Sequence, residues 1–325
     1  PPHPPPPPPA PPTTQSSSAA SDVYKRQEGE LVAQGGQLDI SGTRAEAIVS
    51  LDSTWSHSEY GLARIETKGI LNEQKLTLSD GLAEVINGTI NFAGLVDWRQ
   101  VPNVNLTMDA TQLDVSMIRP DLDAQINLTA KARIEAPESG MQTAIMLERL
   151  TGTWLGQKLI ANGKVKLNPG NTVINDLQAA IGDNRVALDL VMSDKLVGKY
   201  EINAPDLAEI DPSFRGRLEG AGGFAGTPKK PALDGQLSGK DLQIHGWSAN
   251  AFDLDYNVSP FSTQSSFMQG DLVGLRQVAN QDFIANASFR AEGNVDKHNA
   301  VLKVSTNTTK LSAKIDARWL EDRWQ

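Results

Sequence analysis

The sequence of 325 residues contains no cysteine, and this absence excludes three kinds of site. Without thiols there can be no disulfide framework, no CxxC redox centre and no thiolate-bound zinc. Basic residues are also outnumbered by acidic ones, since the net charge is −9. Proteins use clustered Lys and Arg to displace counterions from nucleic acid, so we expect no nucleic-acid partner.

Aromatic residues and long apolar runs are scarce as well. Only 6% of the residues are aromatic, although 39% are hydrophobic. No stretch of 18 consecutive apolar residues occurs, so nothing in the sequence spans a bilayer by itself. Helical patterns are limited to single turns, which we expect at 117–123 and 206–213 at most.

Catalytic and cofactor motifs are absent or isolated. The segment GAGGFA at 220–225 fits the G-x-G-x-x-A spacing of a dinucleotide-binding turn. However, Pro228 and Pro231 follow where a helix would have to begin, so we interpret it as a glycine-rich link between strands. The histidines His57, His245 and His298 show no metal-ligand spacing. We therefore expect no enzymatic activity, no metal and no cofactor.

The first 27 residues differ in composition from the rest of the chain. PPHPPPPPPAPP is typical of polyproline II or disorder, and TTQSSSAAS continues as a polar low-complexity run. Residues 21–27, SDVYKRQ, resemble a translated adaptor scar. We expect 1–27 to be a disordered Pro/Ser-rich segment that is not native, and 28–325 to be a folded fragment of a longer protein.

From residue 28 onward, hydrophobic residues recur with a period of two. Segments such as AIVSLDS, KLTLSD, GTINFAG and VNLTMDA alternate apolar side chains with polar ones. This alternation is typical of antiparallel strands that have one apolar and one solvated face. Turn signals occur at 79–81, Asn87-Gly88, Asn162-Gly163 and 168–171. With about ten residues per strand, the pattern predicts roughly 25–30 strands.

The fold class expected from this pattern is all-β, with one long, curled antiparallel sheet. A flat sheet of this length with one apolar face must curl over itself, close into a barrel or hold something apolar. Taken alone, the alternation favours a dry sandwich core, in which the apolar side chains pack against one another. The candidate residues for the apolar face are Val49, Leu51, Leu76, Leu78, Ile90, Phe92, Leu106, Met108, Ile126, Leu128, Val165, Leu167, Val186 and Leu188.

One strand–turn–strand pattern occurs twice, about 90 residues apart. The first copy, MDATQLDVSMIRPDLDAQINLTA, begins at Met108, and the second, INAPDLAEIDPSFRGRLEG, begins at Ile202. In both, a proline is followed by an apolar residue at plus two, a small one at plus four and an apolar one at plus six. Repetition of such a unit predicts an elongated array rather than a globe with one active site.

Residues 204–259 carry a more specific pattern, in which a Leu-led turn, a proline and a glycine precede a G-x-x-x-x-P-x-L-x-G-x-L link from Gly226 to Leu237. A second match is formed in the C-terminal segment by Gly293, His298, Leu302, Trp319 and Trp324. In these features the chain resembles the TamB family of the AsmA-like superfamily.

The resemblance implies an elongated, U-shaped hydrophobic groove (a β-taco) that crosses the periplasm and conducts phospholipid between the two membranes. The fourteen candidate residues would then contact the acyl chains. The resemblance also implies an outer-membrane partner of the Omp85 class (TamA-like), reached through parts outside this fragment, and an inner-membrane anchor in a segment missing from this chain.

The alternative is a structural or adhesive β-solenoid, such as an autotransporter passenger, whose interior is filled by its own side chains. Coils of right-handed β-helices contain roughly 20–25 residues with short parallel strands. The longer unit and the hairpin turns of this chain favour an antiparallel meander.

Overall fold

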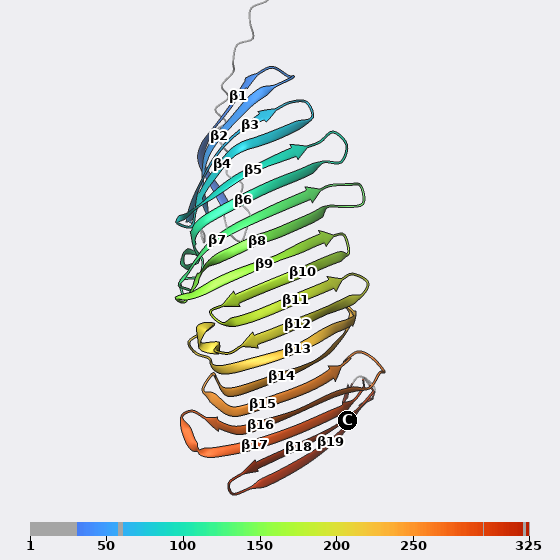
Figure 1. Ribbon diagram of the computed structural model, residues 1–325. Helices are drawn as coiled ribbons and strands as arrows, with labels where there is room; N and C mark the ends of the chain where they lie inside the picture. The colour runs from blue at the N-terminus through green and yellow to red at the C-terminus, as the bar shows by residue number, and fades with distance from the viewer. Residues whose placement is uncertain (1–30, 58–60, 295, 321–322, 325) are drawn as a thin grey trace, which may run out of the picture.

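The computed structural model describes residues 31–57, 61–294, 296–320 and 323–324, and these form one antiparallel sheet. The strands are β1 (Leu31–Gly42), β2 (Ala47–His57), β3 (Gly61–Leu71), β4 (Lys75–Val85), β5 (Gly88–Asp97), β6 (Asn103–Asp114), β7 (Ala124–Glu135), β8 (Gln142–Trp154), β9 (Gln157–Asn168), β10 (Asn171–Ile181), β11 (Asn184–Met192), β12 (Leu196–Ala204), β13 (Arg215–Thr227), β14 (Lys230–Ile244), β15 (Trp247–Val258), β16 (Ser266–Gln277), β17 (Asn280–Gly293), β18 (Lys297–Thr306), β19 (Lys310–Leu320) and β20 (Arg323–Trp324). Each strand pairs with the next one along the chain, so the sheet is a continuous meander (Figure 1).

The expected open, curled all-β sheet is confirmed, but the expected number of strands is wrong. Strands β1–β19 are nine to fifteen residues long, so fewer of them use the same length of chain. The described residues contain twenty strands instead of 25–30. Every pairing among them is antiparallel, which contradicts the parallel coils of the solenoid alternative.

Two of the four turn signals lie in hairpin turns. Ile86 and Asn87 have φ angles of 43° and 58°, as the two central residues of a type I′ turn require, and they join β4 to β5. Gly170, with φ 70°, lies in the turn between β9 and β10.

The other two turn predictions are wrong. Asn162-Gly163 lies inside β9, and residues 79–81 lie inside β4, where the register shifts between Leu78 and Gly81. Gly163 is required for a different reason, because a Cβ atom there would approach the Cα of Leu177 to 2.9 Å. Glycine in a strand interior often marks such a close approach instead of a turn.

The helical elements in the described residues are two three-residue 3-10 turns, η1 (Val115–Met117) and η2 (Leu207–Glu209). The turn expected at 206–213 contains η2, whereas η1 begins two residues before the expected segment. Both follow a strand and begin at an aspartate, because Asp114 accepts a hydrogen bond from the Ser116 amide and Asp206 accepts one from the Ala208 amide. The repeat in the sequence is therefore also a repeat in the structure.

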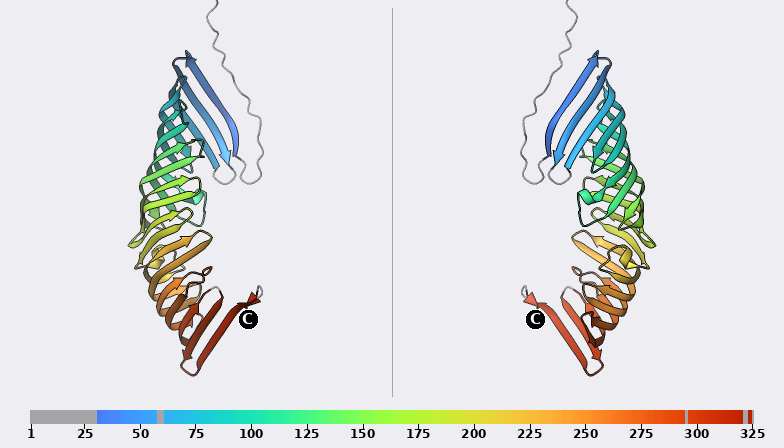
Figure 2. Two further views of the ribbon diagram at one scale, coloured as in Figure 1. Left: turned by 90° about the vertical axis from the view of Figure 1, so that its right-hand side faces the viewer. Right: turned by 90° about the vertical axis from the view of Figure 1, so that its left-hand side faces the viewer.

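Viewed from the side, the sheet is a single bowed layer (Figure 2). Strands β1–β3, in blue, and β18–β19, in dark red, bend toward the same side of the central strands (Figure 2). No second sheet covers either face in the part of the chain that the structure describes. The described part of the chain accordingly has few buried hydrophobic residues, and most of them are alanines such as Ala110 and Ala124.

Several strands bend at β-bulges that are held by a side chain from a neighbouring strand. A bulge places an extra residue in one strand, which bends the strand and increases its twist. At three bulges the extra residue has a positive φ, and its amide donates to an Asn or Asp side chain; we call these contacts bulge clips. The donor and acceptor residues are Gln112 and Asn127 (2.8 Å), Asp176 and Asp189 (2.7 Å), and Gly274 and Asn286 (2.8 Å).

Candidate functional site: an uncharged apolar face

The register of the sheet assigns every paired residue to one of two faces. Antiparallel partners point to the same side, and neighbours along a strand point to opposite sides. We define the apolar face as the face that contains Phe92 and Met108, which are partners in β5 and β6, and the charged face as the other. Followed from strand to strand, the register places all fourteen candidate residues on the apolar face. Their contact with lipid remains a prediction.

The apolar face carries no formal charge across its whole length. From β1 to β19, none of its paired positions is occupied by Asp, Glu, Lys or Arg. The charges of the paired strand positions lie on the opposite face. At about 4.8 Å between neighbouring strands, this uncharged surface is roughly 85–90 Å long.

The apolar face is also uncovered. None of the fourteen candidate residues is fully buried, and Leu167 and Val186 are 42% and 44% exposed. Toward the C-terminal end of the sheet, Leu311 and Ile315 are 59% and 58% exposed. A dry sandwich core would bury these side chains, so that alternative is wrong for the described residues. A continuous exposed apolar surface indicates a binding surface.

On the apolar face, large side chains lie flat over glycines of the neighbouring strand. A Cβ atom on Gly81 would lie 2.3 Å from the ring of Phe92, and one on Gly94 would lie 2.6 Å from Leu106 Cδ2. The sequence analysis identified the two large residues but missed the glycines. The spacing of Gly94 by two residues from Phe92 is a signal that could have revealed it. Gly81 is three residues from Leu78, because the register shifts between them, so the same signal is missing there.

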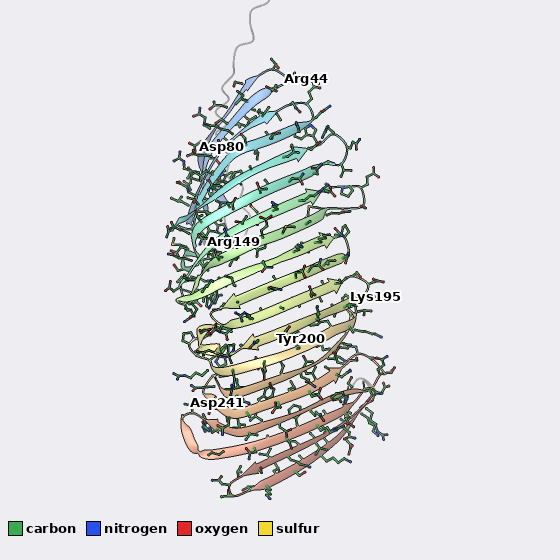
Figure 3. The ribbon with its side chains drawn as sticks, in the orientation of Figure 1. Arg44, Asp80, Arg149, Lys195, Tyr200 and Asp241 are labelled. Carbon is green, nitrogen blue, oxygen red and sulfur yellow. The ribbon has the colours of Figure 1, made fainter. Side chains whose placement is uncertain are left out.

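In strands β12–β15, two tyrosines and two glycines form one row across the apolar face. Tyr200 pairs with Gly222, Gly222 with Gly235, and Gly235 with Tyr256. The two tyrosine hydroxyls are hydrogen-bonded to each other over the glycines. Tyr200 lies between the two rims of the sheet (Figure 3), and its ring centroid is 5.7 Å from that of Phe224. The sequence analysis did not identify this pair.

Burial, followed by the hydrogen bond to Tyr200, raises the pKa of Tyr256 above its ordinary value of 10.0. A phenol is protonated at neutral pH even at its ordinary pKa, and the upward shift leaves Tyr256 in that state. It therefore retains its hydrogen-bond donor.

One rim of the sheet is held by η2. Trp154, at the end of β8, donates from Nε1 to the backbone oxygen of Ile210 at 2.8 Å. Glu209 accepts from the Asp183 amide at 3.0 Å and from Asn184 Nδ2 at 2.9 Å. These contacts hold η2 against the ends of β8, β10 and β11.

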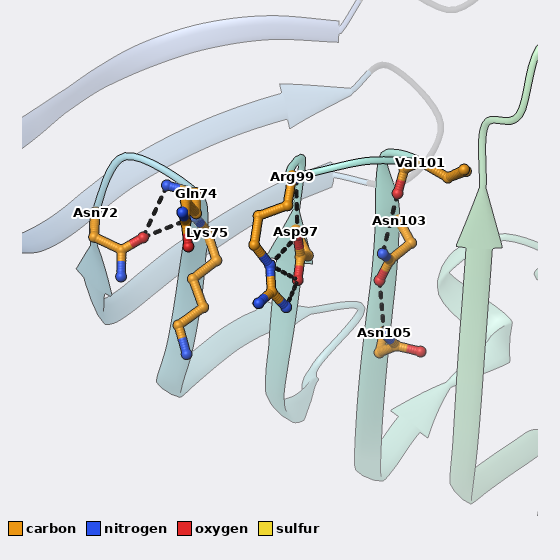
Figure 4. Close-up of polar contacts among 8 residues, drawn as sticks. All are labelled: Asn72, Gln74, Lys75, Asp97, Arg99, Val101, Asn103 and Asn105. Atoms are coloured by element: carbon orange, nitrogen blue, oxygen red, sulfur yellow. Dashed lines mark hydrogen bonds and ion pairs between the residues drawn. The ribbon is translucent and has the colours of Figure 1, made fainter.

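The opposite rim of the N-terminal strands is held by short polar contacts (Figure 4). Asn72 Oδ1 accepts from two turn amides at 2.9 Å, and Asn105 Nδ2 donates to Asn103 Oδ1 at 3.0 Å. Arg99 donates from Nη2 to Asp97 Oδ2 at 2.5 Å. The hydrogen bonds from the Arg99 side chain, and then from its amide, lower the pKa of Asp97 to about 2.

Two hollows on the charged face differ in the sign of their charges. A hollow of about 460 Å³ over β5–β9 is lined by Lys131, Arg133, Lys164 and Lys166. A larger one of about 1390 Å³ over β12–β18 includes the acidic residues Glu201, Glu219, Asp234, Asp253, Asp255 and Asp271. Only the charged face therefore changes its electrostatic character along the sheet.

No group of three His, Cys, Asp or Glu side chains that could hold a metal ion occurs within the described ranges. The glycine-rich segment 220–225 lies inside β13, so its interpretation as a link between strands is wrong. His245 contacts Phe214 edge to face, with 5.7 Å between the ring centroids. Among the described elements, none is a helix with the length and hydropathy to cross a membrane.

Comparison with known proteins gives one family match and one informative relative. Residues 11–325 match the family model described as the TamB N-terminal domain. A curated relative, the translocation and assembly module subunit TamB of Haemophilus influenzae, is 24% identical over 181 residues. That alignment covers 55% of this chain but only 14% of the relative. No solved structure matches the chain.

The family match begins inside the segment 1–27 that the composition sets apart. Residues 1–30 lie outside the described part of the structure, so the division of the chain at residue 27 remains a prediction.

Proposed function

Because the chain belongs to the TamB N-terminal domain family, we propose that its apolar face carries phospholipid acyl chains along one segment of a route between two membranes. The family is that of a translocation and assembly module subunit, and lipid movement is the finer function proposed here. One observation carries the proposal: the apolar face is free of charge and uncovered from β1 to β19.

The physical argument concerns the cost of exposing an acyl chain to water. Each CH₂ group moved into water costs about 0.8 kcal/mol, so a 16-carbon chain resists leaving an apolar environment by roughly 10 kcal/mol. A continuous apolar surface lowers that cost at every step of the path. Because the face carries no charges, the charged headgroup is more stable in solvent, beyond the apolar surface.

The proposed location is the periplasm, with an inner-membrane anchor in a part of the protein outside this chain. The proposed partner is an outer-membrane protein of the Omp85 class, reached through other parts of the protein. The name of the Haemophilus influenzae relative, a subunit of a translocation and assembly module, supports a partner of this kind. The role proposed for this segment is that of a route and not of a catalyst.

The test introduces single charges on the two faces of the same strands. In the full-length parent protein, Leu106→Asp, Leu167→Asp and Leu188→Asp place a carboxylate on the apolar face. An unpaired charge on an apolar path costs several kcal/mol or draws water into it, so we expect each change to reduce lipid transfer by roughly tenfold or more. The measurement is phospholipid transfer between inner-membrane and outer-membrane fractions.

The matched controls are Thr107→Asp and Lys166→Asp, which alter the neighbouring positions on the charged face. We expect these variants to transfer lipid normally at equal protein levels. Photocrosslinkers at Leu106 and Leu167 should capture phospholipid, whereas those at Thr107 and Lys166 should not. Equal effects of charges on the two faces, or no capture from the apolar face, would make the sheet a scaffold instead of a route.

A further inference from the structure

The Tyr200–Gly222–Gly235–Tyr256 row places two neutral phenol groups on a surface that carries no charged side chain. A Cβ atom at Gly222 would lie 2.7 Å from Tyr200 Cε1, and one at Gly235 would lie 2.8 Å from the Tyr256 hydroxyl oxygen. The tyrosine side chains therefore lie flat against the glycine backbones. Their hydroxyls meet above β13 and β14, two strands that contribute only glycine to this row.

The hydroxyl pair has one donor hydrogen to spare. A tyrosine hydroxyl contains one donor and two acceptor positions. When one hydroxyl donates to the other, the hydrogen of the second is left over. Among the described residues, neither hydroxyl has another hydrogen-bond partner. The pair therefore presents a neutral hydrogen-bond donor on the apolar face.

We propose that the Tyr200–Tyr256 hydroxyl pair binds the ester carbonyl oxygen of a diacyl phospholipid whose acyl chains lie on the apolar face. This inference rests on the proposed function and adds a defined binding position to it. An ester carbonyl is a neutral acceptor, and it lies where the acyl chain begins. A phosphate is a poorer fit, because no Lys or Arg shares this face to offset its desolvation.

The residues beside the row suit the acyl chains. Tyr200 pairs with Leu188 on one side, and Tyr256 pairs with Met268 on the other. Leu188 is half-buried and Met268 is 37% exposed, so both contribute accessible apolar surface. A lipid that hydrogen-bonds to the hydroxyl pair can therefore keep its chains on apolar side chains in either direction along the sheet.

The experiment compares two lipids that differ only in the proposed acceptor. The probes are dipalmitoyl phosphatidylethanolamine and the dihexadecyl ether analogue, which has the same head and chain lengths but no ester carbonyl. Binding to the purified chain is measured by competition with a fluorescent phospholipid. We expect the wild type to prefer the diester by about three- to tenfold, the range that a neutral hydrogen bond supplies. The double variant Tyr200→Phe/Tyr256→Phe should bind both lipids equally, with its affinity for the ether analogue unchanged.

The matched control is Thr67→Val. Thr67 also lies on the apolar face, in β3, and its buried hydroxyl has no hydrogen-bond partner among the described residues. Because this hydroxyl is buried, its removal controls for the loss of a hydroxyl that lipid does not reach, and we expect the preference to persist in this variant. A preference retained in the double tyrosine variant would overturn the inference, whatever the result for Thr67→Val.

The remaining outcomes separate the two proposals. If the wild type binds both lipids with the same affinity, the hydroxyl pair is not an ester site, although the proposed function stands. If the wild type binds neither lipid, the proposed function fails as well. Should the double variant not fold, the wild-type comparison and the single variants Tyr200→Phe and Tyr256→Phe, each expected to weaken the preference, still decide the question.

Discussion

The apolar face differs between its N-terminal strands β4–β9 and its C-terminal strands β12–β17. In β4–β9, aliphatic side chains such as Leu76, Leu106 and Val165 dominate, and glycines occur singly between them. In β12–β17, glycines are frequent and aromatic rings lie among them. The aromatic residues at paired positions of this C-terminal part are Tyr200, Phe224, Trp247, Phe252, Tyr256 and Phe289.

The difference shows that the absence of charge and the absence of polarity are separate properties. Both regions exclude Asp, Glu, Lys and Arg from the apolar face. In the described strands β4–β9, methyl groups dominate this face, and no tyrosine hydroxyl lies on it. Only the C-terminal region places a tyrosine hydroxyl pair there, and it does so over glycines. If the apolar face carries lipid as proposed, we expect a lipid to slide over the first region and to pause on the second.

The largest expected effect comes from filling the glycine row of the C-terminal region. A Cβ atom at Gly222 would lie 2.2 Å from the backbone oxygen of Asp234, so Gly222→Val must displace both that strand and the Tyr200 ring. Overpacking of this kind costs roughly 1–3 kcal/mol. We expect faster hydrogen exchange in β12–β15 and unchanged exchange in β4–β6, because repeat arrays confine damage to neighbouring units.

The matched control for this change is Gly35→Val in β1. A Cβ atom at Gly35 meets nothing within 4 Å, and no positive φ requires glycine there. We expect little change in the exchange of any strand. If both variants left β12–β15 equally protected, the glycines would not be what allows the tyrosines to lie flat.

A smaller effect is expected from removing a bulge clip in either region. Asn127→Ala leaves the Gln112 amide in β6 without its acceptor, and Asn286→Ala does the same to the Gly274 amide in β16. Each loss should cost about 0.5–1.5 kcal/mol. Hydrogen exchange should accelerate at Gln112 in the first variant only, and at Gly274 in the second only.

The control for the clips is Asn127→Asp, which keeps an oxygen at the acceptor position and should preserve protection of the Gln112 amide. Acceleration at both bulges in either alanine variant would contradict the idea that each clip acts on its own strand. It would instead indicate that the curl of the sheet forms as one unit.

The apolar face could be predicted from the sequence because side-chain direction alternates with every residue of a strand. Positions such as Leu106 and Met108 need no information from other strands to be assigned to one side. The bulges could not be predicted in this way. At Gln112 an extra residue reverses the alternation. The bulge is marked by the positive φ angle of Gln112, which cannot be read from the sequence.

The tyrosine pair was missed because its geometry depends on three connections between strands and on three registers. Tyr200 and Tyr256 are 56 residues apart, and their hydroxyls meet only because the two intervening strands place Gly222 and Gly235 between them. The turn prediction at Asn162-Gly163 was wrong for a related reason. Glycine is required there because Leu177 on the next strand approaches closely, and not because the chain turns. Cross-strand partners are set by register, which local patterns specify poorly.

The smallest expected effect concerns pH, and it distinguishes the turn after β5 from the turn between β13 and β14. Hydrogen bonds from the side chain and amide of Arg99 lower the pKa of Asp97 from 3.8 to about 2. A carboxyl group whose pKa is lowered by folding stabilises the folded state above its ordinary pKa, and this contribution is lost as the pH falls from about 4 to about 2. The C-terminal turn is held by Thr227 Oγ1, which accepts from the Lys230 amide at 3.1 Å and does not titrate in this range.

We therefore expect the N-terminal turn, and not the C-terminal one, to loosen in acid. The direct measurement is an NMR titration of the Asp97 carboxyl carbon, in the wild type and in Arg99→Gln. Removing the guanidinium should move the pKa of Asp97 back toward 3.8, because the side chain of Arg99 is the largest cause of its shift. Amide chemical shifts at Asn103, the ladder partner of Asp97, should follow the same titration, whereas those at Lys230 should stay constant. A pKa that remained near 2 in Arg99→Gln would mean that the amide hydrogen bond of the turn, and not the guanidinium, lowers it. Constant shifts at Asn103 throughout the titration would mean that the two turns do not differ in their response to acid.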